Sequence, residues 1–377
     1  MTRPSMTRLH RTGAPPAGRI RLRVAVLAAA LLAACTPMQP PGAGLGGTPP
    51  ASAAPAPAAA APAAAASRQP DLQRLVDDAH ARFKGLTDGA NADYIPDLAK
   101  VPADLFGVAI VTVDGRVYTA GDTDYRFSIQ SVSKPFTAAL VMQQQGTEAL
   151  QQRIGVEPTG FPFNSIEAIA LQPQRSNNPL VNAGAIAAVS MVKAPNAEAK
   201  YRLIEDWLGA FAGERLSLMP DIYASEAATN QGNRAIAALL AKYERIYADP
   251  AESVDVYTRQ CSIGVSAKQL AVMGATLANG GVNPVTRQRV LDARHVPKLL
   301  AVMTMAGFYD EAGLWAYQAG LPAKTGVGGG IVAVVPGRMA IVGFSPRLNK
   351  AGNSIRATRA IEHIATALDA NVFGAGR

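Results

Sequence analysis

The sequence FSIQSVSKPFT, at residues 127–137, follows a polar turn and runs directly into the apolar segment AALVM. This pattern predicts a loop that leads into a helix, with Ser131 and Lys134 in the first helical turn. Side chains three residues apart on a helix have Cβ atoms about 5–6 Å from each other, so the two groups are within mutual reach. A serine hydroxyl is a poor nucleophile until a base removes its proton, and a lysine amine can do so if burial lowers its pKa. Serine at a helix start is also a common N-cap, so the pair alone leaves both interpretations open.

A second motif, LPAKTGVGGG, lies near the C-terminus at residues 321–330. Ser-x-x-Lys and Lys-Thr-Gly are two elements found together in the penicillin-recognising serine enzymes. A phosphate-binding loop is excluded by the order of residues, because such a loop places its glycines before the lysine. Glycines allow backbone amides to approach a substrate closely, so this segment is a candidate oxyanion hole. Alone, the motif would be interpreted as a flexible turn.

Two β-hairpins are predicted, one on each side of a long helical region. Residues 106–113 and 116–119 form two runs around an Asp-Gly turn, and residues 331–344 form two apolar runs around Pro-Gly. Helical patterns cover the middle region and one segment toward each end: residues 131–305, 72–83 and 354–368. Strands at both ends with helices between them predict an α/β domain whose antiparallel sheet is assembled from remote segments.

The bulk composition is that of a globular enzyme. The chain has 377 residues, of which 49% are hydrophobic and 17% are charged. The net charge is +8, but six arginines and no acidic residue precede Cys35, which leaves +2 for the rest. A balance so close to neutral gives no electrostatic argument for nucleic-acid binding.

The N-terminal segment has the features of an export signal. Residues 1–34 carry arginines followed by an apolar run that is too short to span a bilayer but suits a signal peptide. The run ends in LAAC, which resembles a bacterial lipobox and implies lipidation of Cys35; ordinary secretion is the alternative. Residues 35–68 are rich in Ala and Pro and predict a disordered tether. We therefore expect a catalytic domain at residues 69–377, extracytoplasmic on the periplasmic side and lipid-anchored to a bacterial membrane, with Cys261 unpaired.

The chain from about Tyr94 to Ser354 resembles the serine-dependent glutaminases, which share the β-lactamase/transpeptidase-like fold. The resemblance rests on motifs in matching order: ADYIP (92–96), FSIQSVSK (127–134), GVEPTG (155–160), NPLVNAGAI (178–186), SE (225–226), NGGVNP (279–284), GFYDEAG (307–313) and LPAKTGVGGG (321–330). It implies hydrolysis of L-glutamine to L-glutamate and ammonia, without cofactor or metal, by a homodimer or homotetramer. It also implies the architecture predicted above, a sheet of N- and C-terminal strands with helices packed on it and a helical middle region.

The resemblance assigns roles to individual residues. Ser131 would attack the side-chain amide, Lys134 would take its proton, and Tyr257 would relay a proton near the nucleophile. The backbone amides of Ser131 and Val327 would hold the oxyanion, and Glu226 would pair with the substrate ammonium. The full set of implied substrate contacts is Tyr94, Ser131, Asn182, Glu226, Asn233, Tyr257, Tyr309 and Val327.

The sequence departs from the family pattern at two positions, and it is compatible with two alternative functions. Gly232 stands where the family often has Arg, and Pro135 stands where many members have an aliphatic residue. One rival is a penicillin-recognising hydrolase such as a β-lactamase, peptidase or esterase, although a Ser-Asp-Asn element is not evident. The other is a non-catalytic glutamine-binding lipoprotein. The chain has no G-x-S-x-G or H-E-x-x-H motif, and the three histidines beyond the leader are expected to be surface or hydrogen-bonded residues.

Overall fold

A computed structural model describes residues 71–374 of the chain. The predicted signal peptide (1–34), the lipidation site Cys35 and the tether (35–68) lie outside the described residues. The first described helix, α1 (Leu72–Phe83), begins close to the predicted start of the catalytic domain at residue 69. Its N-terminus is capped by the Asp71 carboxylate, which accepts a hydrogen bond from the Arg74 backbone N–H at 3.1 Å.

The two predicted hairpins form one antiparallel sheet. Its strand order is β2-β1-β8-β7-β6. The bounds of these strands are β1 (Gly107–Thr112), β2 (Val117–Gly121), β6 (Ala323–Thr325), β7 (Gly330–Val335) and β8 (Met339–Phe344). The N-terminal hairpin joins the C-terminal one through β1 and β8, where Ile110 is the register partner of Ile341. The prediction of an antiparallel sheet built from remote segments is therefore confirmed.

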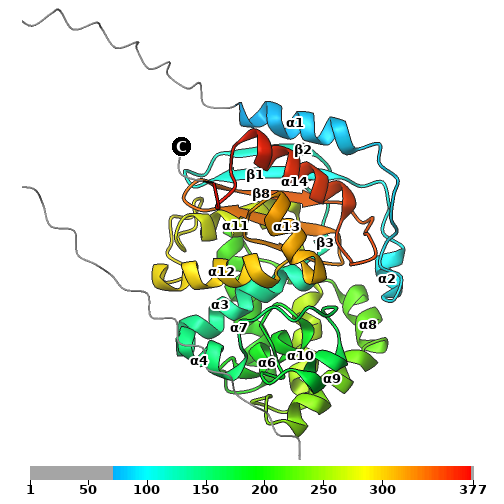
Figure 1. Cartoon of the computed structure of the whole chain (residues 1–377), viewed down its shortest axis with the longest axis vertical. Helices are drawn as coiled ribbons and strands as arrows, with labels where there is room; N and C mark the ends of the chain where they lie inside the picture. Colours follow the sequence, from blue (N-terminus) through cyan, green and yellow to red (C-terminus); the bar gives the residue numbers. More distant parts are fainter. Residues whose placement is uncertain (1–70, 375–377) are drawn as a thin grey trace, which may run out of the picture. The chain divides into compact units, whose positions relative to one another are not determined.

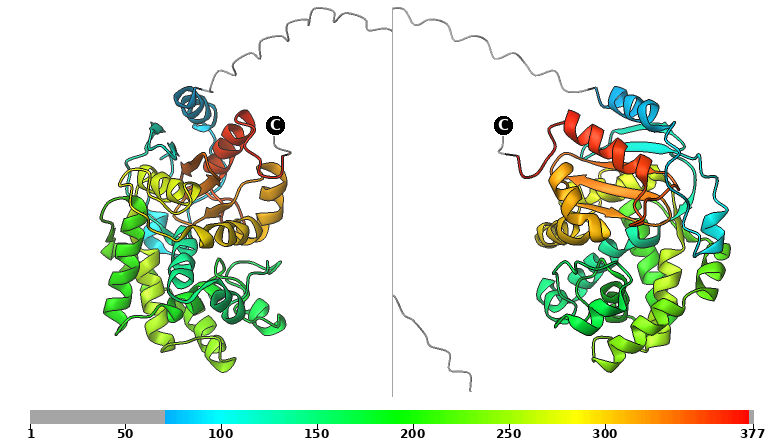
Figure 2. Two further views of the ribbon diagram at one scale, coloured as in Figure 1. Left: turned by 90° about the vertical axis from the view of Figure 1, so that its left-hand side faces the viewer. Right: turned by 45° about the vertical axis from the view of Figure 1, so that its right-hand side comes forward.

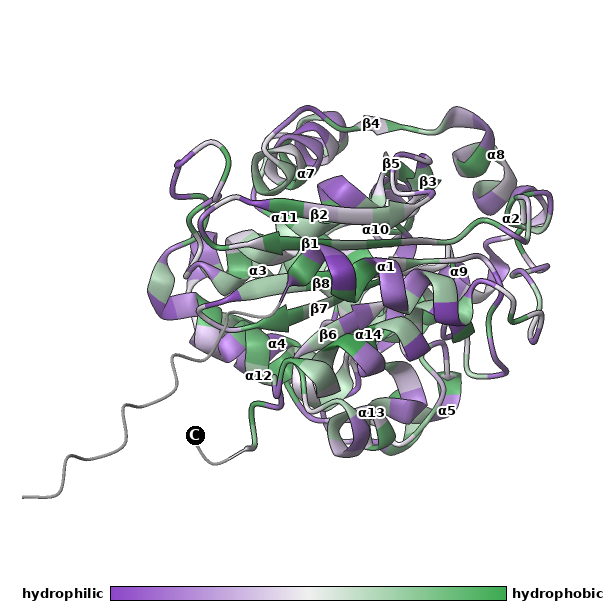
Figure 3. Cartoon of the chain, turned by 90° about the horizontal axis from the view of Figure 1, so that it is seen from above, coloured by the Kyte–Doolittle hydropathy of each residue, from purple (hydrophilic) through white to green (hydrophobic). Residues whose placement is uncertain are grey.

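Helices cover both faces of this sheet. Helix α1 and helix α14 (Ile355–Ala367) lie side by side on one face, and α11 (Ala267–Ala278) packs on the other (Figures 1 and 2). Strands β1, β7 and β8 are buried along their whole length, as expected for strands enclosed on both sides. Figure 3 shows the corresponding hydrophobic colouring of the central strands. Gly274 lets α11 approach closely, since a Cβ there would lie 2.5 Å from a Val332 methyl carbon.

The middle of the chain is helical, as predicted. Its helices, with the short ones that flank it, are α2 (Pro96–Ala99), α3 (Lys134–Gln145), α4 (Thr147–Arg153), α5 (Ile166–Leu171), α6 (Asn182–Met191), α7 (Ala197–Ala212), α8 (Pro220–Ala228), α9 (Gln231–Lys242), α10 (Pro250–Cys261), α12 (Val296–Ala306) and α13 (Ala312–Gln318), and the 3₁₀ helices η1 (Gln130–Ser133), η2 (Ala293–His295) and η3 (Tyr309–Glu311). A second small sheet of β3 (Phe127–Ser128), β5 (Ile263–Val265) and β4 (Ser217–Leu218) lies within this region. The sequence does not predict this sheet, because strands of two or three residues carry no readable periodicity.

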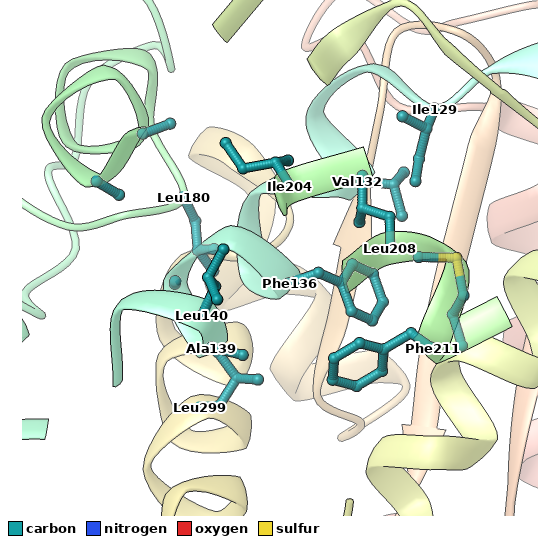
Figure 4. Packing of buried hydrophobic residues seen from close by; sticks show 14 of the residues in the cluster. Ile129, Val132, Phe136, Ala139, Leu140, Leu180, Ile204, Leu208, Phe211 and Leu299 are labelled. Atoms are coloured by element: carbon teal, nitrogen blue, oxygen red, sulfur yellow. The ribbon is translucent and has the colours of Figure 1, made fainter. Parts of the chain in front are cut away.

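Helix α3 is the central helix of the helical region. Every residue from Lys134 to Met142 is buried. The Phe136 ring packs edge-on against Phe211 with 5.0 Å between centroids (Figure 4), and the Trp207 indole N–H donates to the Phe136 carbonyl at 2.9 Å. The helix that begins at Lys134 is consequently fixed on all sides by the hydrophobic core.

The start of this helix differs in one respect from the prediction. Ser131 lies in the 3₁₀ helix η1, and the α-helix begins only at Lys134. In an α-helix the Ser131 carbonyl would accept a hydrogen bond from the backbone of residue 135, which is a proline and has no N–H. The carbonyl accepts instead from the Lys134 N–H, which closes a tighter 3₁₀ turn around the serine.

Candidate active site

Ser131 and Lys134 lie at the junction of η1 and α3, and both are buried. Lys134 is 1% exposed, and its ammonium donates to the Asn182 side-chain oxygen at 2.6 Å. The Tyr257 and Phe163 ring centroids lie 5.8 and 5.9 Å from its nitrogen. Burial lowers the pKa of Lys134 to about 8, against an opposing effect of the Glu226 carboxylate. About one tenth of this side chain is therefore an uncharged amine at pH 7, and about one half at pH 8, which is the form that a base requires.

Asn182, the first residue of α6, connects three of the predicted site residues. Its side-chain oxygen accepts from Lys134 and, at 3.2 Å, from the Tyr257 hydroxyl. Its side-chain nitrogen donates to the Asn233 side-chain oxygen at 2.9 Å. Burial raises the pKa of Tyr257, so this phenol stays protonated and can donate. The relay role of Tyr257 stays a prediction, since its hydroxyl donates to Asn182 and not to the nucleophile.

Glu226 lies in the last turn of α8 and is 7% exposed. Its carboxylate accepts a hydrogen bond from the Gln130 amide at 3.0 Å. Burial raises the pKa of Glu226 to about 7, while the Gln130 hydrogen bond and the Lys134 charge oppose the rise. An added cation, such as an ammonium group, would stabilise the ionised form of this buried carboxylate.

The glycine-rich turn after β6 packs directly against the nucleophile loop. A Cβ on Gly328 would lie 2.3 Å from the Ser128 carbonyl oxygen, and one on Gly326 would lie 2.9 Å from a Val132 methyl carbon. Glycine is needed at these positions because no side chain fits between the two segments. The contact brings the turn that carries Val327 against the segment that contains Ser131, and the oxyanion hole of these two backbone amides stays a prediction.

Tyr309 is a buried phenol that lies near Ser131. It lies in η3 with a left-handed φ of 56° and is 6% exposed. Its buried hydroxyl has no hydrogen-bond partner among the described residues, and burial raises its pKa, while the nearby Ser131 side chain and Val327 backbone oppose the rise. Phe163 packs on its ring with 4.4 Å between centroids, and the Lys324 nitrogen lies 4.3 Å from the ring centroid. These contacts hold a non-glycine residue in an unfavourable backbone conformation, as is common at functional sites.

Tyr94 is placed at the mouth of the site rather than inside it. Its side chain is 54% exposed, and together with Phe163 and Val327 it lines a cavity of about 630 Å³.

Among residues 71–374, His, Cys, Asp and Glu side chains form no group of three or more that could hold a metal ion.

The two departures from the family pattern leave the site geometry intact. Gly232 is exposed, and a Cβ added to it would have no atom within 4 Å, so its side of α9 faces open space. The position of Asn233 is set instead by its hydrogen bond to Asn182. Pro135 fits the 3₁₀ turn described above. One histidine differs from expectation: His295 is buried, and neither ring nitrogen has a hydrogen-bond partner.

Two residues of the site were missed from the sequence. Gln130 immediately precedes Ser131 in the quoted motif, and nothing in the sequence distinguishes it from the other polar residues there. Phe163 contacts both Lys134 and Tyr309, and its place in the loop sequence GFPF gave no indication of this.

Comparisons with known proteins identify the family. A family model described as Glutaminase matches residues 89–373. A glutaminase of Colwellia psychrerythraea is 53% identical over 306 residues, which cover 81% of this chain and 98% of the relative. Glutaminase 1 of Escherichia coli K12 is 51% identical over 302 residues, covering 80% and 97%.

Solved structures agree as well. The structure of a probable glutaminase, ybaS, superposes with a TM-score of 0.80 at 51% identity and covers 81% of this chain and 98% of its own. A probable glutaminase from Bacillus subtilis complexed with 6-diazo-5-oxo-L-norleucine gives a TM-score of 0.71 at 28% identity, covering 80% and 95%.

Proposed function

The chain belongs to the glutaminase family and hydrolyses L-glutamine to L-glutamate and ammonia, and we propose that it does so through an acyl-enzyme on Ser131 with Lys134 as the base. Its fold is the β-lactamase-like fold of that family. The observation that carries the mechanism is the burial of Lys134, which lowers its pKa to about 8 three residues after a buried serine. An amine with this pKa can accept a proton near neutral pH.

The reaction then proceeds in two halves. Ser131 Oγ attacks the side-chain carbonyl carbon of glutamine while Lys134 takes the hydroxyl proton, and the backbone amides of Ser131 and Val327 stabilise the oxyanion. The proton passes to the leaving nitrogen, ammonia departs, and a γ-glutamyl ester remains on Ser131. Water attacks this ester while Lys134 again accepts a proton, the bond to Ser131 Oγ breaks as Lys134 returns that proton to the serine oxygen, and L-glutamate is released. Tyr257, which shares Asn182 with Lys134, and Tyr309, which lies near Ser131, are the candidate proton relays.

Substrate recognition rests on the α-amino and α-carboxylate groups. Glu226 is the proposed partner of the ammonium, supported by its burial and its raised pKa of about 7. The amides of Asn182 and Asn233 and the hydroxyls of Tyr94 and Tyr309 supply neutral contacts. A charge-assisted contact inside a buried pocket selects for a small zwitterion.

The test is ammonia release from L-glutamine by the full chain and by Ser131→Ala. We expect the variant to lose at least about 10³-fold in kcat while keeping the wild-type far-ultraviolet circular dichroism spectrum and Tm. Mass spectrometry of the wild type quenched during turnover should show the mass of a γ-glutamyl adduct, and the variant should show none. A Ser131→Ala variant with near wild-type kcat would remove Ser131 from the mechanism.

The same preparation separates the rival functions. A penicillin-recognising hydrolase would be acylated by a labelled penicillin, whereas a glutaminase would release ammonia and stay unlabelled. A non-catalytic glutamine-binding protein would bind glutamine without turnover.

We further propose that the enzyme is extracytoplasmic and lipid-anchored through Cys35. The support is the sequence of residues 1–35. Of the helices in residues 71–374, none combines the length and the apolar character needed to cross a bilayer. Incorporation of labelled palmitate into the wild type but not into Cys35→Ala would support the anchor; equal labelling would contradict it.

We also propose that the enzyme assembles as a homodimer or homotetramer. Exposed apolar side chains on α13, Leu314 at 53% and Tyr317 at 86%, support a covered surface there. Light scattering of the detergent-solubilised full chain measures the mass of the assembly, and a monomer at micromolar concentration would contradict the proposal.

A further inference from the structure

A chain of buried hydrogen bonds that begins at Thr137, one turn into α3, holds Gln130 in place. The Thr137 hydroxyl donates to the Gln260 side-chain oxygen at 2.7 Å. The Gln260 amide donates to the Ser133 hydroxyl at 2.9 Å, and the Ser133 hydroxyl donates to the Gln130 carbonyl at 2.7 Å. Gln260 and Ser133 are 0% exposed, Thr137 is 1% and Gln130 is 3% exposed. All three bonds run in one direction, so each group has the donor or acceptor that its neighbour needs.

The end of this chain is a strained residue. Gln130 has a φ of 48°, a left-handed conformation that is unfavourable for a side chain of this size. Such a conformation persists where the surrounding contacts fix it. The bond from Ser133 fixes the carbonyl of Gln130, and therefore the direction in which its side chain leaves the backbone toward Glu226.

We propose that Gln260 is a positioning residue for the substrate-ammonium site: through Ser133 it locks the Gln130 backbone and so aims the Gln130 amide at the Glu226 carboxylate. Gln260 lies on α10 one turn after Tyr257, so the same helix presents a site residue and supports the loop opposite. The inference rests on the proposed role of Glu226 in binding the ammonium.

The surroundings of Glu226 make the Gln130 contact consequential. The ionisable groups that act on the carboxylate or are acted on by it are Lys134, Tyr94, Tyr257 and Cys261. Of these, Lys134 alone is cationic, and its ammonium is engaged by Asn182. The Gln130 amide is the neutral donor that keeps the carboxylate oriented and ionised between substrate molecules.

The experiment compares Gln260→Met with wild type and with Ser262→Ala. Met has nearly the volume of Gln but cannot bond to Ser133 or Thr137. Ser262 is an equally buried hydroxyl at the end of the same helix, where it donates to the Thr258 carbonyl at 2.9 Å outside the chain described above. The measurements are KM and kcat for L-glutamine and inhibition constants for L-glutamate and for glutarate, which lacks the amino group.

For Gln260→Met we expect KM for glutamine and the inhibition constant for L-glutamate to rise about tenfold. The inhibition constant for glutarate and kcat should stay within about threefold, because the carboxylate contacts and Lys134 remain. The acid limb of kcat/KM should move to higher pH, because Glu226 loses a hydrogen bond that favours its ionised form. Ser262→Ala should match the wild type in all four constants.

A merely structural role gives a different pattern. Equal weakening of L-glutamate binding and glutarate binding would overturn the inference, and so would a fall in kcat with KM unchanged. If Gln260→Met does not fold, Ser133→Ala removes the next bond and should show the same selective loss of L-glutamate affinity. Where both variants fold, their effects should not add, since they break one chain; additive effects would overturn it.

Glu226→Gln separates this inference from the proposed function. If that variant binds L-glutamate as well as the wild type does, the role of Glu226 is wrong and the inference falls with it. If Glu226→Gln loses L-glutamate affinity while Gln260→Met does not, the positioning role alone is overturned.

Discussion

The two buried ionisable groups of the site predict a steep loss of activity as the pH falls from 8. In the proposed mechanism Lys134, with a pKa of about 8, acts when neutral, and Glu226, with a pKa of about 7, acts when ionised. Between pH 8 and pH 7 the neutral fraction of Lys134 falls from about one half to about one tenth. The ionised fraction of Glu226 falls from about nine tenths to about one half over the same range. The two factors together lower kcat/KM about tenfold, and the logarithmic slope approaches about two below pH 6.

The assay is initial ammonia release at subsaturating glutamine across pH 5.5–8.5 at constant ionic strength. The two apparent pKa values belong to the coupled pair, so the slope is the quantity to compare. In Glu226→Gln the slope should fall to about one, and the remaining midpoint should lie below that of the wild type, because Lys134 loses a nearby negative charge. In the enzyme–substrate complex the glutamine ammonium neutralises Glu226, so the acid limb of kcat should also lie below that of kcat/KM.

As a control, enzyme held at each pH and returned to pH 8 must regain full activity, which excludes unfolding. A profile that is flat between pH 6 and 8 would refute the assignment of Lys134 as a neutral base. A wild-type slope of one that Glu226→Gln leaves unchanged would refute the titration of Glu226.

Three further changes test the architecture of the site. Lys134→Ala should lower kcat on the order of 10³-fold with little change in KM, measured by ammonia release, because the base is lost; a variant keeping most of its activity would reassign the base. Gly328→Ala should lower both kcat and Tm, because the new Cβ would lie 2.3 Å from the Ser128 carbonyl oxygen. The turn that carries Val327 must then shift, which should cost about 1–3 kcal/mol of stability. An unchanged kcat would contradict the oxyanion role of this turn. Phe136→Ala should lower the free energy of unfolding in urea by about 3–5 kcal/mol, because the ring is fully buried against Phe211, and a loss below about 1 kcal/mol would contradict its place in the core.

The elements with strong patterns could be predicted from the sequence. The two hairpins have apolar runs of strand length on either side of turn residues, and the structure places them at residues 107–121 and 330–344. Strand β6 and the small second sheet could not be predicted, because their pairing depends on tertiary contacts and not on periodicity. The 3₁₀ turn at Ser131 could have been predicted from the sequence, because Pro135 has no N–H to donate to the Ser131 carbonyl in an α-helix.

The site could be predicted residue by residue only through the family motifs. No periodicity relates Asn182 to Asn233 or Glu226 to Gln130, because these pairs come from different helices and meet in space alone. The sequence also could not show that the Tyr257 hydroxyl donates to Asn182 while Tyr309 lies near Ser131, since both contacts join residues far apart in the chain. The burial of these side chains and their orientation toward one another are determined by how the helices pack, which the sequence pattern does not encode locally.

The burial of Lys134 and Glu226 is best explained by the reaction and not by stability. The folded-state pKa of Glu226 lies near 7 against 4.5 for the free group, so its ionised form destabilises the fold fully above pH 7, and the cost disappears as the pH falls toward 4.5. The pKa of Lys134 lies near 8 against 10.5, so its charged form destabilises the fold fully below pH 8, and that cost disappears only toward pH 10.5. Each shift corresponds to about 3 kcal/mol when taken alone. The structure therefore keeps two unfavourable groups at neutral pH. In the proposed mechanism the substrate ammonium would relieve the cost at Glu226, and Lys134 would serve as the base that activates Ser131.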